Sequence, residues 1–273
     1  MSTTKRAPCP QCNRGPKDTA LAVTSDERGT VEYCHRCGYT SAENHDRPRL
    51  ERIAPAPRSN TPKAAEPLDW SDRAEAIWRR TRPLRGTVGQ TYLERRGCML
   101  PPADSDLRFL PGSGQYPPSL CARVTDARTA KAISLHFTRL ATDGQGKAGT
   151  DCDKLLLAGH RKRGGVIRLW RDEAVTYGLA LAEGIETALV SARVFAPIWA
   201  TVDAGNMTEF PLLPGIDCLA VYADHDQAGM RAAVGCAARW QKAGREVAVY
   251  RSQLAGEDIA DVLARLGTRK GAA

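Results

Sequence analysis

Four cysteines near the N-terminus have the spacing of metal ligands. Cys9 and Cys12 form one C-x-x-C pair, and Cys34 and Cys37 form a second. Zinc binds four thiolates in a tetrahedron, and two such pairs can supply all four. A segment this short buries little apolar surface, so bound metal would supply much of its folding free energy. We therefore expect a structural Zn²⁺ site here. The alternative is a disulfide or redox pair, which is disfavoured in a protein without an export signal.

Three carboxylates follow two apolar runs in the last third of the chain. Glu183 comes directly after Leu179–Ala182, and Asp224 and Asp226 come after Cys218–Ala223. In a parallel sheet, ligands bind beyond the carboxyl ends of the strands. Clustered carboxylates repel one another unless cations lie between them, and Mg²⁺ or Mn²⁺ prefers such oxygen ligands. We expect a catalytic Mg²⁺ or Mn²⁺ site at these three residues.

The elements around these carboxylates predict an α/β fold. From about residue 177 the pattern alternates apolar strands with amphipathic helices, which indicates a small parallel sheet with helices on both faces. The predicted strands are 179–182, 198–202, 218–223 and 246–250, and the predicted helices are 186–195, 227–243 and 258–266. Asp258 either adds a further acidic group to the metal site or caps the last helix. Glu186 is typical of a first-turn helix acid.

The segment before this sheet reads as α+β. Two helices are expected, near residues 70–78 with Asp69 or Ser71 as N-cap, and over residues 88–96 with Gly97 as the stop. The period-2 pattern of Ile133, Leu135 and Phe137 predicts a strand whose apolar face is opposite His136. Further strands are expected at 107–110, 120–124, 155–157 and 166–170.

These patterns divide the chain into three modules and a linker. Residues 46–67 contain five prolines and little apolar periodicity, which is typical of a linker. We expect a zinc ribbon at 1–45, this Pro-rich linker at 46–67, a basic α+β segment at 68–172, and the parallel-sheet domain at 173–273.

The charge distribution suggests a polyanionic partner. The 273 residues include 39 Lys and Arg against 31 Asp and Glu, a net charge of +8. Basic residues predominate up to about residue 172, and acidic residues predominate after it. This asymmetry favours phosphate binding by the basic first two-thirds of the chain and cation binding by the acidic last third. The alternative is that these charges only form a solvated surface. No apolar stretch is long enough to span a membrane, and the N-terminus lacks a signal peptide's apolar core, so we expect a cytoplasmic protein.

Three blocks of the last third resemble the TOPRIM domain, which DnaG-type primases, topoisomerases and some nucleases share. They read ALAEGIETAL, AVYADHDQAGMRAA and GEDIADVL, within roughly residues 177–266. The cysteine pairs resemble the zinc ribbon of the same primases. The stretch KLLLAGHRKRGGVIRLW, residues 154–170, resembles the segment before TOPRIM in phage and plasmid primases. The order of modules is similar to that group of DnaG-type primases.

This resemblance implies a DNA primase, a nucleotidyltransferase that makes short RNA primers on single-stranded DNA from nucleoside triphosphates by a two-metal mechanism. It implies Glu183 as catalytic acid or base, Asp224 and Asp226 as metal ligands, and a supporting role for Asp258. The sequence departs from bacterial replicative primases at Thr187, where they often have an aspartate. Its location would be the bacterial host cytoplasm if the protein is phage- or plasmid-encoded.

The triphosphate and the template require cations, and the basic segment supplies candidates. They are Lys154, Arg161, Lys162 and Arg163 near its end, and Arg123, His136 and Arg139 on or near predicted strands. Lys154 is the strongest candidate because it opens the primase-like stretch. The alternative interpretation is that Lys154 is a solvated surface residue without a role in binding.

Two other functions remain open on the sequence. One is another TOPRIM phosphoryl-transfer enzyme, such as a nuclease. The other is a non-catalytic zinc-ribbon DNA-binding protein with a relic TOPRIM domain, which the intact Glu183, Asp224 and Asp226 disfavour. The helicase motif G-x-x-x-x-G-K-[ST] is absent from the sequence, so we expect a separate replicative helicase as partner.

Overall fold

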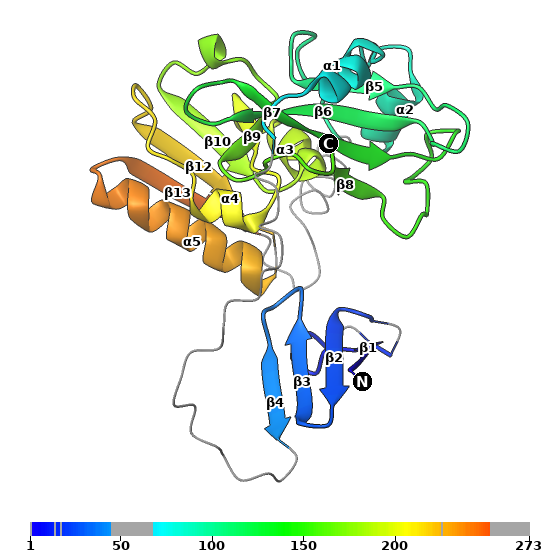
Figure 1. The fold of residues 1–273 in the computed structure, drawn as a ribbon. Helices are drawn as coiled ribbons and strands as arrows, with labels where there is room; N and C mark the ends of the chain where they lie inside the picture. The colour runs from blue at the N-terminus through cyan, green and yellow to red at the C-terminus, as the bar shows by residue number, and fades with distance from the viewer. Residues whose placement is uncertain (1, 14, 17, 45–67, 225, 252–273) are drawn as a thin grey trace, which may run out of the picture. The chain divides into compact units, whose positions relative to one another are not determined.

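The computed structural model describes residues 2–13, 15–16, 18–44, 68–224 and 226–251 (Figure 1). The chain divides into two compact units, Met1–Ala65 and Glu66–Ala273. The expected linker at 46–67 and the expected helix at 258–266 lie outside the described residues.

The N-terminal unit is an antiparallel sheet with a very small core. Its strands are β1 (Thr3–Ala7), β2 (Leu21–Asp26), β3 (Gly29–Cys34) and β4 (Thr40–Asn44), paired in chain order. Its buried apolar side chains in the described part are those of Cys9, Leu21 and Cys34. So small an apolar core cannot stabilise a fold by itself, which is the situation in which a structural metal contributes folding free energy.

The second unit is built on one sheet, which has nine strands within the described residues. The order is β13-β12-β10-β11-β9-β6-β7-β8, and β5 pairs with β6. The bounds are β5 (Leu107–Leu110), β6 (Ser119–Asp126), β7 (Ala132–Arg139), β8 (Lys154–Leu156), β9 (Gly165–Arg168), β10 (Gly178–Ala182), β11 (Ile198–Ala200), β12 (Cys218–Tyr222) and β13 (Glu246–Tyr250).

One half of this sheet is parallel and covered by helices on both faces (Figure 1). Alternate residues of β10 face two different cores. Ala180 and Ala182 pack in the core that contains α3 (Ile185–Ser191), whereas Leu179 and Leu181 pack in the core that contains α5 (Gln227–Lys242). Burial of both faces explains why these strands read as continuous apolar runs rather than as alternating ones.

The other half is antiparallel, and it too is covered on both faces. Leu93 of α2 (Val88–Arg95) packs in one core with Leu120 of β6. Ala74 of α1 (Asp72–Arg79) packs in another core with Cys121, the next residue along β6. The mixed α/β class expected from the sequence is confirmed.

The two halves meet at strands β9 and β11, which pair antiparallel through Arg168 opposite Trp199 and Ile167 opposite Ala200. The boundary expected near residue 172 therefore lies between two strands of one continuous sheet. The short helix η1 (Asp172–Ala174) occupies this connection.

Most predicted element ends agree with the structure to within a few residues. Ser71 is the N-cap of α1, and its side chain accepts a hydrogen bond from the backbone N–H of Ala74. Gly97 follows α2 with a positive φ of 69°, as expected of a helix stop. Helix α4 (Ala204–Thr208) was not expected, because it is too short for periodicity to reveal.

Strand β7 corrects one expectation. Leu135 and Phe137 share a core on one face, but Ile133 packs in the core on the opposite face. The pairing of β6 with β7 passes from Val124–Ser134 to Thr125–Ala132, so Ile133 is the extra residue of a β-bulge. A bulge moves the side chains that precede it to the other face of the strand. The prediction that all three residues share a face is wrong for Ile133.

Among the described residues, none of the helices combines the length and the apolar character that a membrane span requires.

Candidate zinc and Toprim sites

The four N-terminal cysteines converge as the sequence predicts. Their Sγ atoms all lie within 4.8 Å of one another. The Sγ atoms of Cys9 and Cys37 are 3.7 Å apart, and those of Cys12 and Cys34 are 3.8 Å apart. A tetrahedral zinc with Zn–S bonds of about 2.3 Å would place its sulfurs about 3.8 Å apart. The donor set and its spacing therefore fit Zn²⁺.

Backbone hydrogen bonds stabilise each C-x-x-C turn around this site. The N–H of Cys12 donates to the Cys9 sulfur at 3.4 Å. In the second turn, Gly38 has a φ of 72° and its N–H donates to the Cys34 carbonyl at 3.0 Å. Burial favours the neutral thiol of Cys34, but hydrogen bonds from the Cys37 and Arg36 backbone amides outweigh it and lower its pKa. These amides stabilise a thiolate, the form that binds metal.

Glu183 and Asp224 lie at the carboxyl ends of adjacent strands. Glu183 follows β10, Asp224 comes soon after β12, and the two strands are paired in parallel. Burial raises the pKa of Glu183 to about 7, and the negative charges of Asp224, Asp226 and Asp203 raise it in the same direction. The acids therefore repel one another, as the sequence argument anticipated.

Two further contacts hold Asp224 in place. A Cβ added to Gly229 of α5 would lie 2.9 Å from the Asp224 carbonyl oxygen, so only glycine allows this close approach of helix and turn. The hydroxyl of Thr187 donates to Asp224 Oδ1 at 3.4 Å. Thr187 therefore contacts the acidic site although it carries no charge.

Asp226 has a structural role as well. It is the N-cap of α5, and its Oδ1 accepts a hydrogen bond of 2.8 Å from the Gly229 N–H. The other carboxylate oxygen is not engaged by this cap, so the same side chain could cap the helix and bind a cation.

Asp203 is an acid that the sequence reading missed. It follows β11, whose carboxyl end lies beside that of β10, and it caps α4 by accepting from the Asn206 N–H at 2.8 Å. Its second oxygen pairs with Lys162 Nζ at 2.9 Å. The rule that selected Glu183, an acid just past a parallel strand, would have selected Asp203 too.

The carboxylates suit a hard divalent cation by their chemistry. Among the described residues, however, the cysteines are the one group of three or more possible ligands whose atoms all lie within 4.8 Å of one another. Glu183, Asp224 and Asp226 are therefore too far apart here to share one ion. Two-metal sites place their ions about 3.5–4 Å apart, so a wider carboxylate set fits such a site. Asp258, expected to support it, lies outside the described residues.

A cavity of about 140 Å³ adjoins these acids. Its lining includes Glu183 and Asp224 from the acidic edge and His136 and Lys154 from β7 and β8. A Cβ on Gly184 would lie 3.8 Å from Lys154 Nζ, which shows how closely this lysine approaches the turn after β10. The sheet therefore brings Lys154 and His136 next to the acidic site.

Lys154 is anchored by a buried network. Its Nζ pairs with Glu186 Oε2 at 2.9 Å, and Tyr92 donates to Glu186 Oε1 at 3.0 Å. Burial by itself would raise the pKa of Glu186, but the Lys154 ammonium outweighs it and lowers the pKa to about 2. Glu186 lies in the first turn of α3 as expected, and it also positions a cation.

His136 presents an unpaired nitrogen beside this cavity. Its Nδ1 is buried and has no hydrogen-bond partner among the described residues. Burial lowers the pKa of His136 to about 4, and the Lys154 ammonium acts in the same direction. The imidazole is therefore neutral at pH 7 and can donate or accept one hydrogen bond.

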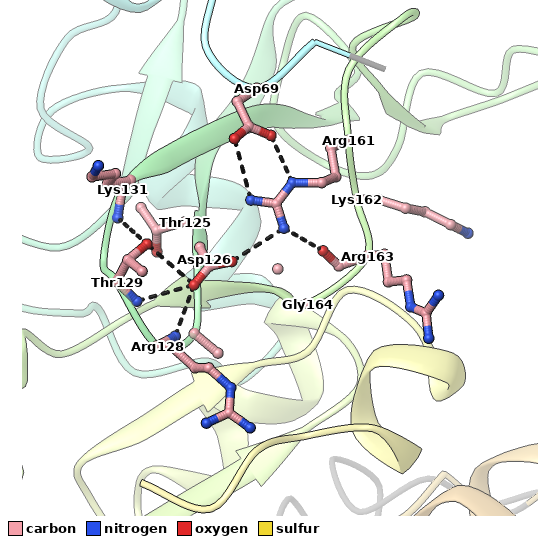
Figure 2. Close-up of polar contacts among 12 residues, drawn as sticks. Asp69, Thr125, Asp126, Arg128, Thr129, Lys131, Arg161, Lys162, Arg163 and Gly164 are labelled. Carbon is pink, nitrogen blue, oxygen red and sulfur yellow. Dashed lines mark hydrogen bonds and ion pairs between the residues drawn. The ribbon is translucent and has the colours of Figure 1, made fainter. Parts of the chain in front are cut away.

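Three candidate cations form ion pairs near the turn after β6 and the loop before β9. Arg161 donates to Asp69 at 2.6 Å and to Asp126 at 3.1 Å, which ties three segments of the unit together (Figure 2). Lys162 and Arg163 point away from this cluster (Figure 2). Arg163 pairs with an exposed acid, Glu209, at 2.9 Å. Arg161 is a structural residue by these contacts, and the other two are more accessible.

The remaining candidates lie away from the cavity. Arg123 donates to the buried Asp106 at 2.6 Å and lies 5.0 Å from the ring centre of Trp78. Arg139 donates to the Cys152 carbonyl at 3.4 Å. Of the seven basic candidates, Lys154 and His136 line the cavity beside Glu183 and Asp224, and Lys162 pairs with Asp203.

Family models match two adjacent parts of the second unit. Residues 69–169 match DUF7146, a domain of unknown function, and residues 178–269 match the Toprim domain. No curated protein matches the sequence.

Several solved primase structures are similar in fold. The Aquifex aeolicus primase (zinc binding and RNA polymerase domains) is 13% identical with a TM-score of 0.50, covering 98% of this chain and 77% of that one. The primase fragment of the bacteriophage T7 primase-helicase protein is 14% identical with a TM-score of 0.45, covering 98% and 97%. A DNA primase domain from Pseudomonas aeruginosa is 14% identical with a TM-score of 0.39, covering 75% and 62%. At these identities the similarity concerns the fold alone. The chain therefore combines a four-cysteine, zinc-ribbon-like module with a Toprim domain, in a fold that resembles that of DnaG-type primases.

Proposed function

We propose that this protein is a DNA primase that synthesises short RNA primers on single-stranded DNA. The observation that carries the proposal is the arrangement at the carboxyl edge of the parallel strands, the Toprim edge. There Glu183 and Asp224 follow two adjacent parallel strands and line one cavity with Lys154. This arrangement supports nucleotidyl transfer because it places acids for cations and a cation for phosphate in one site.

The acids would hold the catalytic cations. Glu183, Asp224 and Asp226 are the proposed ligands for Mg²⁺ or Mn²⁺, which when bound supplies activation of the attacking hydroxyl and neutralisation of the leaving pyrophosphate. Glu183 would orient a cation or accept the proton of the primer 3′-hydroxyl. Asp226 caps the start of α5 through its hydrogen bond from Gly229, and its other oxygen, which this cap does not engage, would bind the cation.

The cations on β7 and β8 would bind the triphosphate. Lys154 supplies the positive charge. Its ion pair with Glu186 already restricts the side chain, so less conformational entropy is lost when the triphosphate binds. The neutral His136 supplies a hydrogen bond without adding charge. Lys162 and Arg163 remain candidates for contacts with the template strand, together with Arg139.

The proposed partners follow from this chemistry. They are single-stranded DNA, nucleoside triphosphates and a replicative helicase. The proposed location is the cytoplasm, which is that of a bacterial host if the protein is phage- or plasmid-encoded. The zinc module is proposed to contact the template.

The test is primer synthesis by amide variants. Single-stranded DNA, labelled ribonucleotides and Mg²⁺ are combined with wild type, Glu183→Gln, Asp224→Asn or Asp226→Asn. Asparagine is as good an N-cap as aspartate, so Asp226→Asn removes the charge and keeps the cap. The exposed Glu173→Gln is the control. Short products that are lost by orders of magnitude in the three variants, and retained in the control, support the proposal. Nicked template without short products would identify a nuclease instead.

A further inference from the structure

The second unit contains a larger cavity on the opposite face of the sheet from the Toprim site. Its volume is about 680 Å³. Phe137 and Leu155, a directly opposed pair on β7 and β8, line it. Their chain neighbours His136 and Lys154 line the small cavity beside the acids. Since successive side chains of a strand point to opposite faces, the two cavities are separate sites.

The walls of this cavity are mostly apolar. They come from α1, from the loop after β5 and from strands β7 and β8, and include Ile77, Leu110, Pro111, Tyr116, Phe137 and Leu155. Tyr116 is 62% exposed, so a large aromatic ring stands at this site without being buried by the protein. Apolar cavities of about 300–1,000 Å³ with a few polar groups are typical of small-molecule sites.

The charged groups that line the cavity are all cations. Arg73 and Arg80 lie seven residues apart on α1 and its C-cap, with Ile77 between them, so the three share one helix face. Arg139 of β7 adds a third guanidinium. Neither Arg73 nor Arg80 has an ion-pair partner among the described residues, and no acid lines the cavity. The neighbouring Arg79, by contrast, pairs with Glu75 at 2.7 Å.

We propose that this cavity binds a small amphipathic anion, a molecule with an apolar body and one carboxylate or phosphate. The apolar body would fill the space between Tyr116 and the strands, and the acidic end would pair with Arg73, Arg80 or Arg139. Two arginines that form no ion pair among the described residues, and a third that donates to a backbone carbonyl, favour this class over a neutral or cationic ligand. The proposal does not depend on the acids of the proposed primase site, because the cavity shares no charged residue with the Toprim edge; Arg139, a candidate for the template strand, is the one assigned residue in common.

The test compares ligands that share one apolar body and differ in charge. Octanoate, octanol and octylammonium are titrated into the full-length zinc-loaded protein by calorimetry. We expect octanoate to bind with one site per chain, at least about tenfold tighter than octanol, and octylammonium not to bind. Equal affinities for octanoate and octanol, or no binding of octanoate, would overturn the proposal.

Matched variants locate the site. Arg80→Gln should weaken octanoate binding about fivefold while octanol binding is unchanged, because only a charge is removed. Arg79→Gln, one residue away and already paired, should leave both unchanged. An equal effect of the two substitutions would place the anion elsewhere and refute the assignment. A short single-stranded DNA that displaces octanoate would also refute it, because the cavity would then belong to the template path.

Discussion

Glu183→Gln should make the second unit more stable at alkaline pH when no catalytic metal is present. The folded protein holds this carboxyl half-buried among other acids, which raises its pKa from 4.5 to about 7. A group whose folded-state pKa is raised contributes its stability below the unfolded pKa. That contribution is lost as the pH rises through the folded pKa. Glutamine is neutral at every pH and avoids this loss.

The size of the effect follows from the shift in pKa. One pKa unit corresponds to about 1.4 kcal/mol, so the shift from 4.5 to about 7 corresponds to roughly 3 kcal/mol. Glu183 is only half-buried, and solvent screening reduces this value. We expect the variant to gain about 1–2 kcal/mol over wild type at pH 8, and close to nothing at pH 4.5.

Tryptophan fluorescence provides a selective assay. All five tryptophans lie between residues 70 and 240, so urea unfolding followed by their emission reports on the second unit alone. Wild type and Glu183→Gln are unfolded at pH 4.5, 6 and 8 in buffer without Mg²⁺ or Mn²⁺. Groups such as His136 titrate equally in both proteins, so the difference between them isolates residue 183. Glu173→Gln, an exposed acid, is the control.

A difference between the two proteins that does not change with pH would refute the electrostatic reasoning. It would mean that Glu183 does not face the other acids as the structure describes. If the electrostatic reasoning holds, addition of Mg²⁺ at pH 8 should make wild type more stable than the variant. The cation stabilises the wild-type acids, whereas the variant has one carboxylate fewer to bind it.

Three further outcomes are expected. Cys34→Ser should reduce bound zinc from about one equivalent per chain to none by metal analysis, without changing the tryptophan-reported unfolding. Gly229→Ala should cost about 1–3 kcal/mol of unfolding free energy and reduce primer synthesis, because its Cβ would lie 2.9 Å from the Asp224 carbonyl. Gly235→Ala on the same helix meets only a 3.4 Å contact and should be tolerated. Arg161→Gln should lower the free energy of unfolding in urea by about 1–2 kcal/mol, since it removes the ion pairs to Asp69 and Asp126, and leave the salt dependence of DNA binding unchanged.

Features written in local sequence were predictable. The two C-x-x-C pairs predicted a convergent site because four sulfurs and two turns determine it almost alone. The positions of Glu183 and Asp224 followed from apolar runs that end in acids, since parallel strands share one carboxyl edge. Asp203 could have been found by the same rule, because it comes directly after the apolar run 198–202.

Partners from distant parts of the chain were not predictable. Arg123 and Arg161 looked like candidates for phosphate binding, yet their guanidinium groups pair with Asp106 and with Asp69 and Asp126. The residues near an arginine in the sequence do not indicate whether an acid from a distant segment will form an ion pair with it in the folded protein. The same holds for Lys154, whose partner Glu186 lies 32 residues away. Long-range pairing is a property of the sheet order, which a single sequence leaves undetermined.

The continuity of the sheet leads to a last prediction, that the Toprim segment does not fold alone. Residues 69–169 and 178–269 match separate family models, but β9 of the first pairs with β11 of the second. The buried Arg168 also stacks on Trp199, with its guanidinium carbon 4.4 Å from the ring centre. Removing the first segment would expose an unpaired edge strand and half of a shared core.

We therefore expect a fragment of residues 173–273 to lack a cooperative thermal transition, whereas residues 66–273 should show one by circular dichroism and tryptophan fluorescence. A cooperative transition in the shorter fragment would show that the β9–β11 joint is dispensable. We expect the joint to be required because it determines where the basic residues lie relative to the acids. Lys154 and His136 reach the acids only because an uninterrupted hydrogen-bonded sheet connects β8 to β10. A joint that moved would separate the cations from the carboxylates with which the site is built.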